Sequence, residues 1–179
     1  KYTRITSMIN WDCDVTQINS MRDAVLKKSR HVVEKLLTIS VDSTTVSKFL
    51  ELFSDDVTER LTFISICKFV RETTDDKAVK NASAEAIQML TSYQTQLDSS
   101  QIFYKKLVKF YNALDNRFDK EDKMFAYRYI KKCQLTGVHL DKDIQSKLKK
   151  MRHSIDKAEY NLVNNKDPER DTIVVRLNK

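Results

Sequence analysis

A single glycine, Gly137, and a single proline, Pro168, occur in the 179 residues. Hairpins and glycine-rich loops need residues that tolerate positive φ, and glycine does so without a steric penalty. A β-sandwich, a barrel or a doubly wound α/β fold would therefore lack residues for its turns. The scarcity of glycine predicts an all-α protein, and the chain length suits one domain with a substantial core.

Helical spacing of apolar residues and capping residues between the stripes predict about six antiparallel helices, in a single domain over residues 1–167. The first two are expected over about 15–40 and 46–71, the second with a kink near 54–56. The third opens at 73–76. The fourth follows 98–100 and turns Phe103, Leu107, Phe110, Leu114 and Phe118 inward. The fifth opens at 119–122 and ends at Gly137, a residue suited to the position after a helix.

The sixth expected helix starts after Asp141, ends before Pro168 and has the most regular apolar stripe of the chain. Spacings alternate between four and three residues, as in a coiled coil. The stripe consists of Ile144, Leu148, Met151, Ile155, Ala158 and Leu162. Residues 168–179 are expected to form a tail, in which the β-branched stretch 172–177 could be a short strand.

The other face of this helix is basic and forms the candidate binding face of the chain. Its residues are Lys142, Lys147, Lys149, Lys150, Arg152 and Lys157. The formal net charge of +7 is concentrated in residues 101–160, which hold 15 Lys and Arg against 8 Asp and Glu. Such a surface could meet an acidic protein, nucleic acid or anionic lipid, although a solvated helix face is the plainer interpretation.

No catalytic or metal-binding residues are predicted. The three histidines lack the His-Glu-x-x-His spacing of a zinc helix, and one glycine permits neither a Gly-x-Ser-x-Gly elbow nor a phosphate-binding loop. The histidines are His31, His139 and His153. Acidic pairs at 55–56, 75–76 and 121–122 fall where helices are expected to start. Capping therefore explains them without acid–base chemistry.

Three cysteines, Cys13, Cys67 and Cys133, lie far apart and form no Cys-x-x-Cys pair. We therefore expect reduced, partly buried thiols and a cytosolic location, with the mitochondrial matrix as the alternative. No apolar run is long enough to span a bilayer, and residues 1–7 lack the apolar core of a secretory signal. The absence of an initiator methionine indicates a fragment or a processed product.

Several short motifs follow one another along the chain in a characteristic order. They are Asn10-Trp11-Asp12, Ile102-Phe103-Tyr104-Lys105, Arg128, Gly137-Val138-His139-Leu140, the lysines of 142–157, Tyr160-Asn161 and Asn165-Lys166-Asp167. In this order, over about residues 10–167, they resemble the N-terminal helical region of the thimet oligopeptidase and neurolysin family of zinc metallopeptidases. The sequence departs from the family at Val163-Asn164 and after Pro168.

The resemblance implies a helical lobe that forms one wall of a deep channel for short peptides. The family's zinc helix, its third glutamate ligand and its transition-state-stabilising tyrosine and histidine are outside this chain. We therefore expect no bound zinc, no other cofactor and no hydrolysis by this chain alone. The expected partners are a peptide or a catalytic lobe.

Two other functions remain open. In the first, a shortened homologue works alone as a helical binding module that holds an acidic protein on its basic face. In the second, the chain is a nucleic-acid-binding bundle, which is the less supported reading because no helix-turn-helix signature accompanies the charge.

Overall fold

The computed structural model describes residues 13–42 and 44–164, and the regular secondary structure of these residues is entirely α-helical. The helices are α1 (Val15–Thr38), α2 (Val46–Thr73), α3 (Lys77–Asp98), α4 (Gln101–Ala113), α5 (Lys120–Leu135) and α6 (Lys142–Asn164). The prediction of an all-α fold of about six helices is confirmed. The tail from 168, with the strand expected over 172–177, lies outside the described residues.

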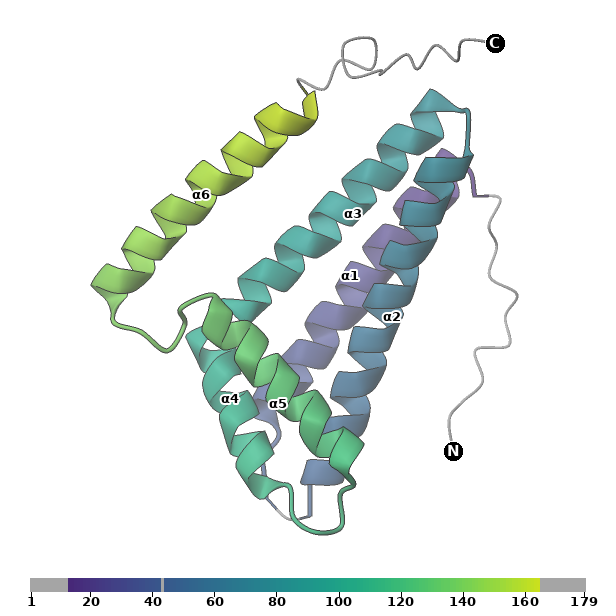
Figure 1. Ribbon diagram of the computed structural model, residues 1–179. Helices are drawn as coiled ribbons and strands as arrows, with labels where there is room; N and C mark the ends of the chain where they lie inside the picture. Colours follow the sequence, from purple (N-terminus) through teal and green to yellow (C-terminus); the bar gives the residue numbers. More distant parts are fainter. Residues whose placement is uncertain (1–12, 43, 165–179) are drawn as a thin grey trace, which may run out of the picture.

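Three long helices, α1, α2 and α3, lie side by side as an antiparallel bundle, and α4 and α5 pack together at one end of it (Figure 1). Among the residues that the structure describes, helix α6 stands apart and does not pack along any of the other five helices (Figure 1). The bundle therefore has its own core without α6.

Acidic and hydroxyl side chains set the helix starts, as the sequence predicts. Asp14 and Gln17 form a capping box on α1: the Gln17 amide donates to Asp14 Oδ1 at 2.7 Å, and Gln17 Oε1 accepts from the Asp14 amide at 3.1 Å. Asp76, Ser100 and Asp119 cap α3, α4 and α5 with their side-chain oxygens. Each cap satisfies an amide that would otherwise lack a partner within the helix.

Two expectations about helix limits are wrong. Helix α4 ends at Ala113, so Leu114 and Phe118 lie on the loop to α5, although both still pack partly buried against the core. The loop forms because Asp115 accepts from the backbone amide of Arg117 at 2.9 Å, a local bond that competes with the helix. Helix α2 runs unbroken through 54–56, so the acidic pair there is not a helix start.

Two apolar clusters fill the bundle. The first cluster, towards α4 and α5, is aromatic, and four phenylalanines in it are 0% exposed: Phe49, Phe53, Phe103 and Phe110. The second cluster lies at the other end of α1, α2 and α3 and is mainly aliphatic, with Ile18, Phe63, Cys67, Ala86 and Leu90 among its members.

A buried polar layer crosses the bundle between the two clusters. Arg60 and Asp56, both on α2 and both with side chains 3% exposed, form an ion pair in which Arg60 Nη2 lies 2.8 Å from Asp56 Oδ2. The Arg60 guanidinium also donates to Gln94 Oε1 on α3 and lies 5.9 Å from the ring centre of Tyr93. Ser29 on α1 donates to the Tyr93 hydroxyl at 3.3 Å.

This layer extends towards α5. Gln94 Nε2 donates to Asp98 Oδ1 at 2.6 Å, and Lys132 Nζ on α5 lies 3.0 Å from Asp98 Oδ2. The prediction that Asp56 caps a helix is wrong. Its carboxylate is instead the anionic partner that permits Arg60 to be buried.

Candidate binding surface on α6

The connection from α5 to α6 is held by hydrogen bonds at the end of α3 and α5. The Thr136 hydroxyl lies 2.7 Å from the Cys133 carbonyl of α5 and 3.3 Å from the Asp98 carbonyl of α3. Gly137 follows with φ of 80°, and its amide donates to the Gln134 carbonyl at 2.9 Å. The prediction that this glycine takes the left-handed position after a helix is confirmed.

The first turns of α6 rest on this connection. Gln145 Nε2 donates to the Leu140 carbonyl at 2.7 Å and to the Val138 carbonyl at 3.2 Å. The Leu148 side chain lies so close to Gly137 that a Cβ at that position would meet Leu148 Cδ1 at 2.5 Å. These contacts fix the start of α6, and no other described helix packs along most of its length.

Replacing Gly137 with alanine is expected to destabilise this junction. A left-handed conformation costs a non-glycine residue about 1–2 kcal/mol, and the new methyl group would also clash with Leu148. Chemical unfolding followed by circular dichroism measures the change in the free energy of unfolding. The same substitution in a Leu148→Ala background removes the clash and leaves the backbone penalty. Equal stability of Gly137→Ala and wild type would contradict the geometry.

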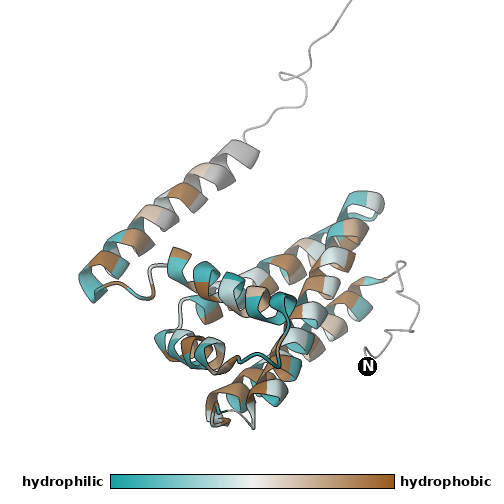
Figure 2. Ribbon diagram, turned by 60° about the horizontal axis from the view of Figure 1, so that its bottom comes forward, coloured by the Kyte–Doolittle hydropathy of each residue, from teal (hydrophilic) through white to brown (hydrophobic). Residues whose placement is uncertain are grey.

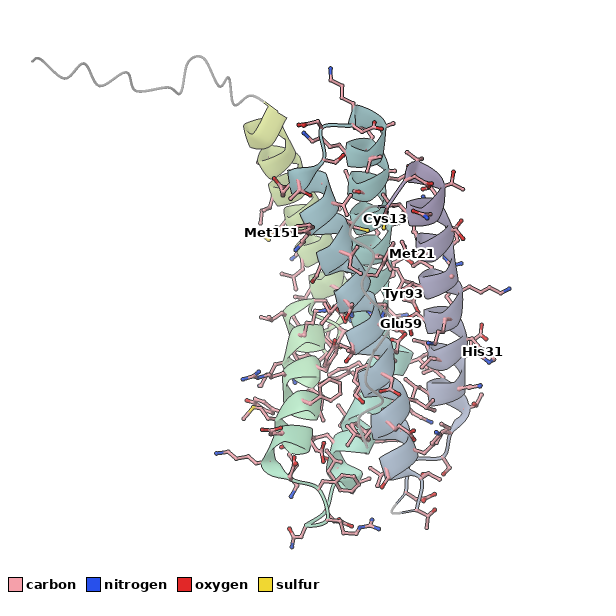
Figure 3. All side chains as sticks on the ribbon, turned by 90° about the vertical axis from the view of Figure 1, so that its right-hand side faces the viewer. Cys13, Met21, His31, Glu59, Tyr93 and Met151 are labelled. Carbon is pink, nitrogen blue, oxygen red and sulfur yellow. The ribbon has the colours of Figure 1, made fainter. Side chains whose placement is uncertain are left out.

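The apolar stripe predicted for the sixth helix is present and largely open to solvent. Ile144 is 45% exposed, Met151 64% and Ile155 56%, whereas the stripe residues Ile18 and Leu36 of α1 are at most 1% exposed. Figure 2 shows hydrophobic positions along α6, which lies apart from the other helices, and Figure 3 labels Met151 on it. The spacing of the stripe was predictable, but its exposure was not.

Three of the six candidate basic residues can be placed. Lys142, Lys147 and Lys150 are exposed on α6. The side chains of Lys149, Arg152 and Lys157 lie outside the described ones. The structure therefore brings exposed lysines and an exposed apolar stripe onto the same helix, while binding by this basic face remains a prediction.

A second apolar surface lies between α2 and α5 and was not predicted from the sequence. A cavity of about 760 Å³ is bordered by the apolar side chains of Val57, Leu61, Met124, Phe125 and Tyr129. Lys120, Glu121 and Arg128 also line it. The sequence feature that could have indicated this cavity is the placement of apolar residues on more than one side of α5. Met124 and Tyr127, 40% and 43% exposed, show that neighbours do not enclose this helix on every side.

The described histidines show no arrangement for catalysis or metal binding. His31 is exposed on the outer side of α1 (Figure 3), where its Nδ1 lies 4.0 Å from Glu34. The His139 ring is 6.5 Å from that of Tyr104, a packing contact at the α5–α6 connection. Within 13–42 and 44–164, no three His, Cys, Asp or Glu side chains come together as metal ligands.

The three cysteines are buried thiols. Burial raises the pKa of Cys133 to about 12 and that of Cys67 to about 11. Nearby Asp98 adds to the effect at Cys133, since its negative charge disfavours the thiolate. Both thiols are thus protonated at neutral pH, and a thiol is a poor nucleophile compared with its thiolate.

Comparison with models of known protein families finds none that matches the chain. Among the described residues, no helix combines the length and apolar character required to cross a membrane.

Proposed function

We propose that this chain is a non-catalytic helical lobe of the thimet oligopeptidase and neurolysin type, which forms part of a peptide channel and leaves hydrolysis to a catalytic lobe. The observation that carries the proposal is the exposed stripe of α6. An apolar surface left in water indicates a place where another polypeptide packs. The order of motifs along the sequence supports the family, and the buried thiols suit a reducing compartment such as the cytosol or the mitochondrial matrix.

The test uses the natural protein, captured from its source cells with an antibody against the α1–α3 bundle. The expected product is much larger than the 21.0 kDa of this chain and cleaves a quenched oligopeptide in a reaction that a zinc chelator abolishes. The 179-residue chain, purified alone, should neither cleave the peptide nor retain stoichiometric zinc. A natural product of the size of this chain, with no peptidase attached, would refute the proposal.

A second candidate function is a helical binding module for an acidic protein. The observation that favours it is the exposure of Lys142, Lys147 and Lys150 on the helix that carries the stripe. Opposite charges across an interface speed association and select the partner. A module of this kind would need no catalytic lobe.

Reversing the charge at Lys147 and Lys150 tests the module. An exposed ion pair contributes about 0.2–1 kcal/mol, so Lys147→Glu with Lys150→Glu should weaken binding to a glutamate-rich helical peptide roughly tenfold. The dependence of affinity on salt should also flatten. The control is Lys27→Glu with Lys68→Glu, which changes the net charge equally at exposed sites on the bundle. Equal weakening by the two pairs would point to net charge alone and count against the module.

A further inference from the structure

The apolar stripe of α6 follows a heptad seam. Ile144 and Met151 are seven residues apart at one seam position, and Leu148 and Ile155 are seven apart at the other. Ala158, also exposed, continues the pattern. A seam of two positions in seven is the surface that a facing helix fills by knobs-into-holes packing.

The shape and composition of the seam favour a helix over a lipid surface. A helix that lies in a membrane interface typically has a broad apolar face with Trp, Phe and Leu. Residues 142–164 contain no Trp and no Phe, and two Leu, Leu148 and Leu162. A narrow seam of Ile, Leu and Met matches the width of one neighbouring helix.

Charge favours an acidic partner over a second copy of this chain. Residues 142–164 hold six Lys and Arg against three Asp and Glu. Two copies of α6 in contact would therefore bring like charges together. Lys147 is exposed and lies three residues after Ile144 and four before Met151, which places it on the border of the seam. Residues at such borders form the ion pairs that select a coiled-coil partner.

The contacts of α6 leave one side of the seam open. At its start, Gln145 is held by the carbonyls of Val138 and Leu140, and Leu148 packs on Gly137. The connection to α5 therefore occupies the border opposite Lys147. A partner helix has access from the side of Ile144 and Met151, where the lysine can meet a carboxylate.

From this arrangement we infer that α6 is one helix of a two-helix coiled coil. The other helix is an acidic amphipathic helix of a partner protein. The partner packs apolar residues on the Ile144–Ile155 seam and places Glu or Asp beside Lys147. The inference rests on the second proposed function, the binding module, and names the surface and the chemistry of its partner.

The probe is a synthetic peptide of about four heptads with Leu at the two seam positions and Glu at the flanking positions. A peptide of the same composition with scrambled spacing is the reference. Fluorescence anisotropy with the full chain should show binding of the heptad peptide and at least tenfold weaker binding of the scrambled one. Met151→Gln with Ile155→Gln removes the seam without adding charge and should weaken binding roughly a hundredfold.

The matched control is Met89→Gln with Ile102→Gln, the same two substitutions at exposed positions on α3 and α4. These changes should leave the affinity unaltered. One outcome would refute the coiled coil and leave the binding module standing. In it, charge reversal at Lys147 and Lys150 weakens binding, the seam variant binds as tightly as the wild type, and the scrambled peptide binds as tightly as the heptad peptide. If no acidic peptide binds, or if neither the lysine nor the seam variant changes the affinity, both fail.

Two further outcomes would replace the acidic helix with another occupant. Sedimentation could show a dimer of the full chain that Met151→Gln with Ile155→Gln dissociates, which would assign the seam to a second copy. Vesicles containing phosphatidylserine could bind the wild type and not the seam variant, which would assign it to a lipid surface. The inference predicts a monomer and no seam-dependent binding to vesicles.

Discussion

Replacing Arg60 with methionine is expected to destabilise the fold by about 3–5 kcal/mol, the range observed when one partner of a buried ion pair is removed. The Asp56 carboxylate, with a side chain 3% exposed, would lose its only ionic partner in the polar layer. Gln94 Oε1 would lose a donor as well, and the guanidinium would no longer lie over Tyr93. The loss at Asp56 occurs where water has little access.

Denaturant unfolding of the full chain gives the change in the free energy of unfolding. The informative companion is Asp56→Leu with Arg60→Met, which removes both charges. This double variant should recover most of the lost stability because apolar replacements of a buried pair are often neutral or favourable. A loss under about 1 kcal/mol for the single variant would show that Asp56 is compensated by another group.

The second large effect is expected from Phe53→Ala in the aromatic cluster. Phe53 is 0% exposed, and its ring centre lies 4.7 Å from that of Tyr129, 5.2 Å from Phe125 and 5.7 Å from Phe103. Alanine would leave a cavity at the point where α2, α4 and α5 meet. Truncation of a buried phenylalanine costs about 3–5 kcal/mol.

Phe69→Ala is the control because it makes the same change on α2 at a residue that is 49% exposed. It should cost well under half as much in the same denaturant titration. Near-ultraviolet circular dichroism should lose intensity in Phe53→Ala, since the rings of Phe125 and Tyr129 lose their fixed neighbour. Equal losses of stability in the two variants would mean that the cluster does not hold α5 in place.

Local rules were sufficient where a short segment decides the structure. Asp119 and Gly137 each act within four residues, and each is found where the sequence predicts it. The end of α4 was missed because Leu114 and Phe118 continue the helical spacing although they leave the helix. The side chain of Asp115 bonds to a nearby amide, and hydrophobic periodicity contains no information about that competition.

The polar layer was missed for a different reason. Because charged residues are usually exposed, the sequence favours a helix cap at Asp56 and does not single out Arg60. A signal was nevertheless present: both fall on the same helical stripe as Phe53 and Phe63, and four residues separate the two charges. Burial itself depends on Gln94 and Tyr93 of α3, which sequence spacing on α2 cannot reveal.

The candidate site was predicted only in its pattern. Helical spacing identified the α6 stripe and its lysines, because periodicity depends on the sequence alone. Whether a stripe is covered depends on the direction in which the helix leaves its neighbour. That direction is set by the bonds of Thr136 and Gln145 to carbonyls elsewhere in the chain.

The Thr136 contact has a consequence for anything held by α6. Its hydroxyl reaches the last residue of α3, so the base of α6 is joined to the long bundle as well as to α5. A force on a partner bound along α6 would be transmitted to α3 through this hydrogen bond. Helix α6 would therefore keep a fixed angle to the bundle. Thr136→Val would remove this hydrogen bond and widen the range of angles between a bound partner and the bundle.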